Sequence, residues 1–164
     1  MDDREIVARQ LGRPPRAFLR VVVRCPFGRP AVTEQAPYDD AGEPFPTTYY
    51  LTCPRLVAAV SRLEAAGGVV RWTAAAAAEP ELAESLARAT ERQRERRRDL
   101  AGGTSGPDEG AVLELGIGGA RNPEQLKCLH AHVAFALADG RYELGERILA
   151  ELEPLWPEDR CCTD

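Results

Sequence analysis

The segment Lys127–His132, with the sequence KCLHAH, holds the densest group of reactive side chains in the chain. It contains Cys128 and both histidines of the protein, His130 and His132, next to the only lysine. Thiolate sulfur and imidazole nitrogen are preferred ligands of Zn²⁺. In thiol enzymes the thiolate acts as the nucleophile and the imidazole as the base. The segment therefore predicts a metal site or a reactive thiol, and the alternative is a buried cysteine beside a hydrogen-bonded imidazole.

We expect this segment to lie in a helix that runs from Asn122 to Gly140. Asn122 can cap the helix, Pro123 suits its first position, and Gln125 completes a start that resembles a capping box. Gly140 is a common stop. The sequence therefore predicts that the cysteine and both histidines lie inside a regular helix.

The helical spacing decides which histidine can share a metal ion with Cys128. Residues four apart lie above one another, so Cys128 and His132 can bind the same ion in an unbroken helix. His130 points roughly 160° away from Cys128 in that geometry. It can join Cys128 only if this turn is frayed or if the cysteine stands at the start of the helix.

Two further cysteines, Cys25 and Cys53, stand at the ends of expected strands, and each precedes a proline. Proline stiffens the turn and removes an N–H donor, as is common beside thiolate ligands. Together with Cys128 and one histidine they would form a Cys3His set that suits Zn²⁺. Zinc is therefore the expected cofactor, with an iron–sulfur cluster as the alternative. Separate buried thiols are the competing interpretation.

Cys161 and Cys162 lie near the end of the sequence, in the segment WPEDRCCTD. We expect a loose tail over residues 154–164. If the tail folds back, these cysteines would instead complete a four-cysteine site.

The elements around these residues predict an α+β fold. β-branched and aromatic runs favour strands, and apolar residues at helical spacing favour helices. We expect a small, mainly antiparallel sheet from the N-terminal third, packed with four or five helices, in a single domain of residues 1–164. A flexible connector is expected over residues 101–110. The expected strands are Ala17–Arg24, Ala31–Ala36, Thr47–Thr52 and Val112–Leu115, and the expected helices are 2–11, 54–67, 80–100, 122–140 and 143–152.

Composition favours a cytoplasmic protein. The chain is 44% hydrophobic and 29% charged, and it lacks the run of about 20 apolar residues that crosses a membrane. Its acidic start, MDDREIVARQLG, does not resemble a secretory signal. In the cytoplasm the five cysteines are expected to be reduced thiols or metal ligands. The net charge of −5 argues against general nucleic-acid binding.

An arginine run near residue 95 is the exception to this acidic character. Its members are Arg92, Arg94, Arg96, Arg97 and Arg98. Glu91 and Glu95 stand three residues before Arg94 and Arg98, at the spacing of ion pairs on a helix. A solvated helix face is therefore favoured over a nucleic-acid surface.

A glycine-rich segment, Gly116–Gly119, suggests a different ligand. Backbone N–H groups at such a turn before a helix can hold a phosphate. The residues expected to take part are Arg13, Arg16, Gly118, Gly119 and Lys127. The spacing matches neither common phosphate-binding motif, and glycine also serves any tight turn.

Four segments together resemble a known family. LGRPPR, RCPFGRPAV, GEPFPTTYYLTCPRL and KCLHAH are similar to the bacterial proteins grouped as DUF501, a family of unknown function. The resemblance spans nearly the whole chain and implies a stand-alone cytosolic protein without an assigned activity. It favours His130 as a ligand, whereas the helical spacing favours His132.

Two classes of function remain open. The first is a small zinc-binding domain with a binding or regulatory role. The second is a thiol- or metal-dependent enzyme that acts on a phosphorylated or anionic small molecule. The sequence assigns no reaction, partner or oligomeric state.

Overall fold

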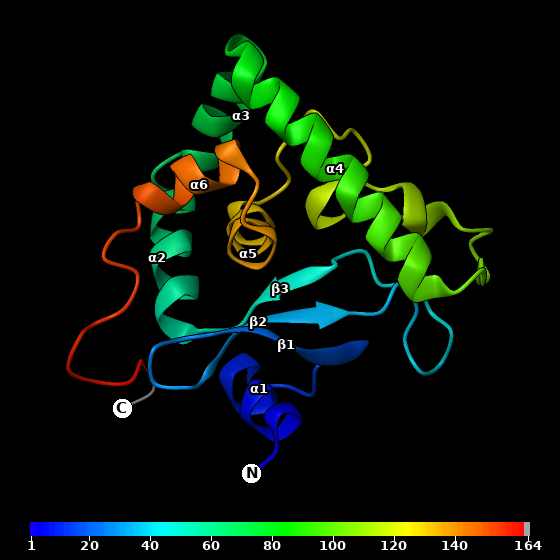
Figure 1. The fold of residues 1–164 in the computed structure, drawn as a ribbon, viewed down its shortest axis with the longest axis horizontal. Helices are drawn as coiled ribbons and strands as arrows, with labels where there is room; N and C mark the ends of the chain where they lie inside the picture. The colour runs from blue at the N-terminus through cyan, green and yellow to red at the C-terminus, as the bar shows by residue number, and fades with distance from the viewer. Residues whose placement is uncertain (163–164) are drawn as a thin grey trace.

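A three-stranded antiparallel sheet forms the base of the computed structural model, which describes residues 1–162 (Figure 1). Its strands are β1 (Phe18–Arg24), β2 (Pro30–Gln35) and β3 (Tyr49–Leu51), in the order β1-β2-β3. β2 is buried along its whole length. Because both outer strands are antiparallel to β2, β1 and β3 run in the same direction, and they end at the same edge of the sheet.

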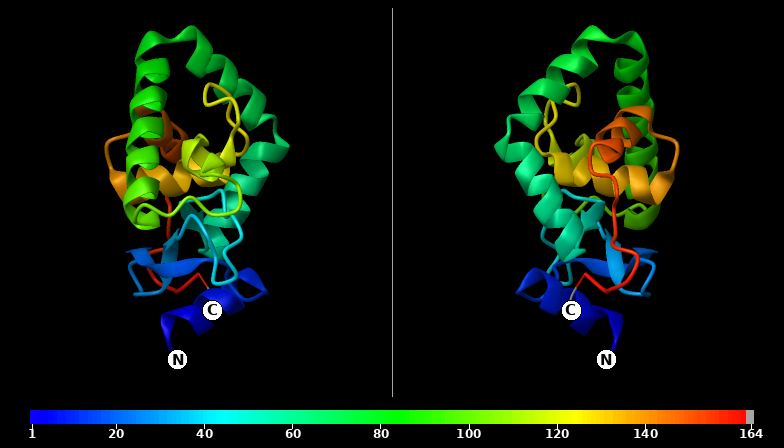
Figure 2. Two further views of the ribbon diagram at one scale, coloured as in Figure 1. Left: turned by 90° about the vertical axis from the view of Figure 1, so that its right-hand side faces the viewer. Right: turned by 90° about the vertical axis from the view of Figure 1, so that its left-hand side faces the viewer.

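Six α-helices are present within the described residues, and α5 lies at their centre. Figures 1 and 2 show α5 above the sheet, enclosed by α2, α3, α4 and α6, while α1 packs on the opposite face of the sheet. All but one of the first eight residues of α5 are buried. The helix therefore supplies much of the core. The helices are α1 (Asp3–Leu11), α2 (Pro54–Ala65), α3 (Gly68–Ala78), α4 (Pro80–Ala101), α5 (Leu129–Asp139) and α6 (Glu143–Ala150).

The α+β class and the antiparallel sheet are confirmed, and α3 is the helix that the sequence analysis leaves unassigned. It follows α2 across Gly67 and Gly68. A Cβ at Gly68 would lie 2.7 Å from the carbonyl oxygen of Leu63 and 2.9 Å from Leu129, so only glycine fits this tight junction. The turn lets α3 begin directly after α2 and bury Trp72.

Two expected elements are wrong. Residues near Val112 form a 3₁₀ helix, η1 (Ala111–Glu114), instead of a strand, and a second one, η2 (Ile117–Gly119), follows. The segment 122–128 is not helical, because α5 begins at Leu129. Asn122 caps a local turn through its side chain, which accepts a hydrogen bond from the N–H of Glu124 at 3.1 Å.

The arginines of α4 only partly form the expected solvated face. Arg94 pairs with Glu91 on the surface as expected. Arg97, however, is completely buried and donates hydrogen bonds to carbonyl oxygens of Phe45 and Val112. Burial lowers its pKa to about 10. Arg97 therefore joins α4 to two loops, which corrects its expected place on the surface.

The C-terminal segment returns to the sheet. From α6 it runs down past α2 toward the sheet edge near α1 (Figures 1 and 2). Arg55 Nε donates to the carbonyl oxygen of Leu155 at 2.9 Å, which holds this segment against α2. The segment up to Cys162 is therefore packed on the molecule, and the last two residues of the expected tail lie outside the described residues. Within residues 1–162, the helices are too short or too polar to cross a membrane.

Candidate metal centre

Cys128 stands at the start of α5 and not inside the helix, which is the arrangement that the sequence requires for His130 to join Cys128. Cys128 is the N-cap residue, with an extended backbone at φ −154°, and it precedes the first helical turn. The carboxylate of Glu64, from α2, accepts the Leu129 N–H at 2.7 Å. A carboxylate that accepts an N–H of the first turn stabilises a helix start. Glu64 therefore replaces the cap that Asn122 was expected to supply.

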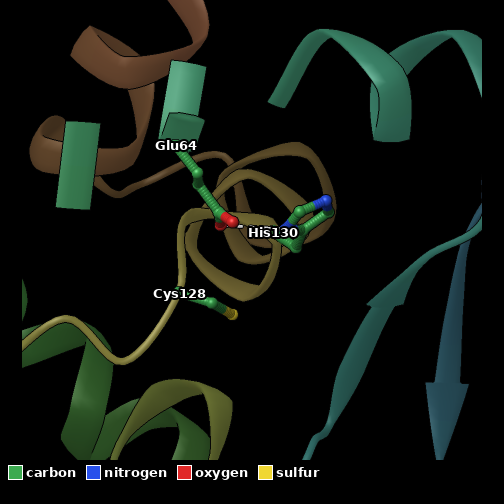
Figure 3. A group of neighbouring side chains, drawn as sticks. All are labelled: Glu64, Cys128 and His130. Carbon is green, nitrogen blue, oxygen red and sulfur yellow. Dashed lines mark hydrogen bonds and ion pairs between the residues drawn. The ribbon is translucent and has the colours of Figure 1, made fainter. Parts of the chain in front are cut away.

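This start brings Cys128 and His130 together with Glu64. One ligand atom from each residue lies within 4.8 Å of the other two, and all three residues are half-buried. His130 Nδ1 is 2.9 Å from Glu64 Oε1. Figure 3 shows the three side chains converging from α2 and from the N-terminal end of α5. This group, called the Glu–Cys–His cluster below, combines ligand types that bind Zn²⁺.

The second ring nitrogen of His130 also has a partner. Nε2 lies 3.3 Å from Ser61 Oγ, one turn before Glu64 on α2. A metal-bound histidine usually donates its other N–H to a polar group, which fixes the ring orientation. With a metal ion at Nδ1, Nε2 would carry the ring hydrogen and donate it to Ser61. The arrangement is the one expected for a metal ligand.

The groups around His130 raise the pKa of its imidazole, so the ring binds a proton more tightly than a free imidazole. The Cys128 thiol is the largest cause that raises the pKa of His130, and the Glu64 carboxylate also raises it, against the opposing effect of burial. The N-terminal end of α5 adds a partial positive charge that favours anionic ligand groups. The cluster thus pairs a basic imidazole with two groups that can carry negative charge.

Two metal-free arrangements can be compared with the same distances. Ser61, His130 and Glu64 form a hydroxyl–imidazole–carboxylate chain like that of a hydrolase. Ser61 lies in the middle of α2, where helical hydrogen bonds use the backbone N–H groups that an oxyanion hole needs. Cys128 and His130 form a thiol–imidazole pair, since a hydrogen bond with Cys128 raises the pKa of His130, but the carboxylate of Glu64 adds a third metal-ligand type beside them. The geometry therefore supports metal binding best.

A cavity of about 620 Å³ lies beside the cluster. Cys128 and His130 form part of its wall, so a ligand in the cavity can reach a metal ion at the cluster. The rest of the wall is largely apolar, with the hydroxyl-bearing side chains of Tyr49, Tyr50, Thr47 and Thr52 among it. Its residues come from α1, β3, α2 and α5 and from the segments that flank β3.

His132 lies away from this site, in the core. Its side chain is fully buried, and Nδ1 lies 2.7 Å from the hydroxyl of Tyr142. Burial lowers the pKa of His132 to about 3. The helical pairing of Cys128 with His132 requires Cys128 inside the helix, and the extended N-cap position of Cys128 does not meet this requirement.

Cys25 and Cys53 follow β1 and β3 at the same edge of the sheet, and both are buried. Cys53 Sγ lies 3.5 Å from Cys162 Sγ. The structure therefore places Cys53 beside the C-terminal segment and not beside Cys128. The third residue next to Cys128 and His130 is Glu64, where the sequence predicted Cys25 and Cys53. Metal ligation by Cys25, Cys53, Cys128, His130 or His132 stays a prediction.

The residues of the expected anion site are only partly gathered. A Cβ at Gly118 would lie 3.8 Å from Cys128 Sγ, and one at Gly119 would lie 3.9 Å from Lys127 Nζ. Arg13 donates to the hydroxyl of Tyr50, and Arg16 pairs with Asp39. The glycines and the lysine thus adjoin the start of α5, whereas Arg16 is held elsewhere.

Glu64 is the cluster member that sequence reasoning missed. It lies in the run SRLE on α2, whose other charged residues are Arg55 and Arg62. Glu64 stands three residues after Ser61, so the two share a helix face. Many charged residues on surface helices have the same spacing, so the pattern alone does not mark Glu64 as a ligand. The fold alone places it opposite α5.

The fold and the cluster together define an α+β protein with a candidate metal centre of three side chains. A family described as "Protein of unknown function (DUF501)" matches residues 21–150, and the chain belongs to this family. The matched region includes Glu64, Cys128 and His130. Comparison with curated proteins and with solved structures gives no match.

Proposed function

We propose that this protein binds Zn²⁺ through Glu64, Cys128 and His130 and uses the ion to bind a small molecule in the adjoining cavity. The observation that carries the proposal is the convergence of three ligand atoms within 4.8 Å at the wall of that cavity. The role is that of a zinc-dependent binding or regulatory protein.

The distances in the cluster suit an ion of this size. Zinc bound to a nitrogen and an oxygen at about 2.0–2.1 Å in tetrahedral geometry separates the two atoms by about 3.3 Å. His130 Nδ1 and Glu64 Oε1 are 2.9 Å apart, so they need to part by only about 0.4 Å. The ion would replace the proton that the two atoms now share.

Three protein ligands leave one tetrahedral position of the ion for another molecule. Structural zinc sites usually have four protein ligands, and sites that bind or transform a ligand keep one position open. Cys128 and His130 line the cavity, so this position would face it. A small molecule with an anionic or sulfur donor would fill the position.

The same open position supports a second candidate, a zinc-dependent enzyme that acts on an anionic small molecule. A zinc-bound water with a lowered pKa is a nucleophile near neutral pH. Turnover of chromogenic phosphate or carboxylate esters by the zinc-loaded protein, lost in Cys128→Ser, would support this candidate. Zinc-dependent binding without turnover would support the first.

Metal content tests the proposal directly. Tag-free protein purified without chelators is compared with Cys128→Ser and Glu64→Gln by plasma mass spectrometry. Each variant is expected to lose one equivalent of zinc relative to the wild type. Glu124→Gln is the matched control, because it removes an exposed carboxylate from the segment before α5. Wild-type zinc content in Cys128→Ser and Glu64→Gln would contradict the proposal.

A further inference from the structure

The cysteines outside the Glu–Cys–His cluster gather at the edge of the sheet where β1 and β3 end. Cys25 and Cys53 reach this edge because the two strands run in the same direction on either side of β2. The C-terminal segment returns to the same edge and places Cys162 Sγ 3.5 Å from Cys53 Sγ. Cys25, Cys53 and Cys162 therefore lie at this edge, and Cys161 adjoins Cys162 in the chain.

The separation of Cys53 and Cys162 fits a shared metal ion. Two sulfurs joined in a disulfide are about 2.05 Å apart. Two thiolates bound to one tetrahedral zinc, each at about 2.3 Å, are about 3.8 Å apart. The two thiols form a hydrogen bond at 3.5 Å, which is close to the second value. Cys53 is completely buried and Cys162 is half-buried, a setting that suits a closed metal site.

We propose that Cys25, Cys53, Cys161 and Cys162 bind a second Zn²⁺ ion in a closed four-thiolate site that fastens the C-terminal segment to the sheet. The site shares no residue with the Glu–Cys–His cluster and does not depend on it. Each thiol gives up its proton to the solvent as its sulfur binds the ion. No electron is transferred, and no oxidant is required.

The charges nearby suit such a site. Zinc with four thiolates carries a net charge of −2, which needs compensation in a partly buried place. Arg9 and Arg29 line the same surface hollow as Cys162. Their guanidinium groups lie where they can offset this charge.

Binding also requires a small movement. Among residues 1–162, only the Glu–Cys–His cluster has three ligand atoms that all lie within 4.8 Å of one another. Zinc would draw the sulfurs of Cys25 and Cys161 closer to the Cys53–Cys162 pair. Cys161 and Cys162 lie outside regular helices and strands, where the backbone can adjust. The family match ends at residue 150, so it covers Cys25 and Cys53 but not the other two cysteines.

The test is the zinc content of the full chain and of the double variant Cys161→Ser/Cys162→Ser. The wild type is expected to hold two zinc ions and the double variant one. Arg160→Ser is the matched control, because it changes an exposed residue beside the pair and is expected to hold two ions. Cys128→Ser is also expected to hold one ion, and all three serine substitutions together none. Circular dichroism checks that each variant is folded.

The outcomes separate this proposal from the first. Equal zinc content in the wild type and in Cys161→Ser/Cys162→Ser overturns the second site, whatever Cys128→Ser shows. An unchanged zinc content in Cys128→Ser, with loss in the double variant, overturns only the Glu–Cys–His site. A wild type without zinc overturns both.

A measurement on the unmodified protein does not depend on how the variants fold. Thiol-reactive dye is added to zinc-loaded wild type before and after a strong chelator, and the labelled cysteines are mapped by mass spectrometry. Cys25, Cys53, Cys161 and Cys162 are expected to be protected together and released together. Labelling of Cys161 and Cys162 at the same rate before and after chelation overturns the site. So does an intact mass that shows a Cys53–Cys162 disulfide in freshly purified protein.

Discussion

His130 is the residue on which the candidate metal centre depends, because its two ring nitrogens join both helices of the site. Nδ1 faces Glu64 and Nε2 faces Ser61, and both of these residues come from α2. The ring is therefore oriented before an ion binds. A ligand held in its binding geometry loses little conformational entropy on binding. In the proposed zinc site, the hydroxyl of Ser61 would thus contribute to zinc affinity without touching the ion.

Replacing Ser61 with alanine tests this role. Ser61→Ala removes the hydrogen-bond partner of Nε2 and leaves all three ligands in place. Loss of such a partner typically weakens metal binding 10- to 100-fold, and we expect about 10-fold here because Ser61 is exposed. Competition with a chromophoric chelator measures the affinity. Arg62→Gln, on the neighbouring position of α2, is the control, and an unchanged affinity in Ser61→Ala would contradict this role.

At the scale of elements, the sequence predicts the helices and strands whose bounds depend on a local pattern of apolar or β-branched residues. The β-branched run before Cys25 and the apolar spacing after Cys53 define β1 and α2 closely. The start of α5 could not be found this way, because its cap comes from Glu64, which is distant in sequence. Local capping signals at Asn122 favoured a longer helix. Tertiary contacts override such signals when a better partner lies opposite.

The burial of Arg97 has the same cause. Its neighbours in the run are charged, so the local pattern predicts an exposed side chain. The helix turns Arg97 toward carbonyl groups in the loop before β3 and in η1, and the guanidinium donates hydrogen bonds to them. The candidate site was likewise predictable only for Cys128 and His130, since Glu64 reaches it through the fold.

Replacing Arg97 with methionine should strongly destabilise the protein. Arg97→Met removes the donor to the carbonyl oxygens of Phe45 and Val112 and to the buried hydroxyl of Thr48. An unsatisfied buried group costs about 1–3 kcal/mol, so the free energy of unfolding should fall by about 2–5 kcal/mol. Urea denaturation measures the change. Arg98→Met is the control, because Arg98 is exposed and pairs with surface glutamates, and it should have little effect.

The lowered pKa of Glu34, on the central strand β2, makes the stability of the protein depend on pH. Burial acts to raise its pKa, but the guanidinium groups of Arg96 and Arg20 outweigh burial and hold the pKa below its usual value. The unfolded state then binds a proton more readily than the folded state. Stability from this group is therefore present above about pH 4.5 and is lost as the pH falls through the folded pKa.

Glu34→Gln should remove this part of the pH dependence. At neutral pH the variant should be less stable by about 1–3 kcal/mol, because two arginines lose a buried charged partner. The difference from the wild type should shrink as the pH falls below about 4.5. Urea denaturation across this pH range measures it. A difference that stays constant with pH would show that Glu34 is not the titrating group.

At the scale of the whole molecule, the two proposed ions would fasten different parts of the chain. The Glu–Cys–His cluster joins α2 to α5 across the core. The proposed four-cysteine site would join the ends of β1 and β3 to the C-terminal segment, where Cys53 already contacts Cys162. No residue belongs to both groups. Their contributions to stability should therefore be close to additive.

Chelation should lower the unfolding temperature, and the size of the decrease should depend on how many zinc ions the protein binds. An ion that binds only the folded state stabilises it by about 2.7 kcal/mol when its free concentration is 100 times Kd. For a chain of 164 residues each kcal/mol raises the unfolding temperature by about 2–4 °C, so two such sites would together raise it by about 10–20 °C. Differential scanning fluorimetry with and without chelator should show the full decrease in the wild type. Cys128→Ser and Cys161→Ser/Cys162→Ser should each show about half of it, and the triple variant should show none. An equal decrease in the wild type and the triple variant would mean that zinc acts on this protein through other residues.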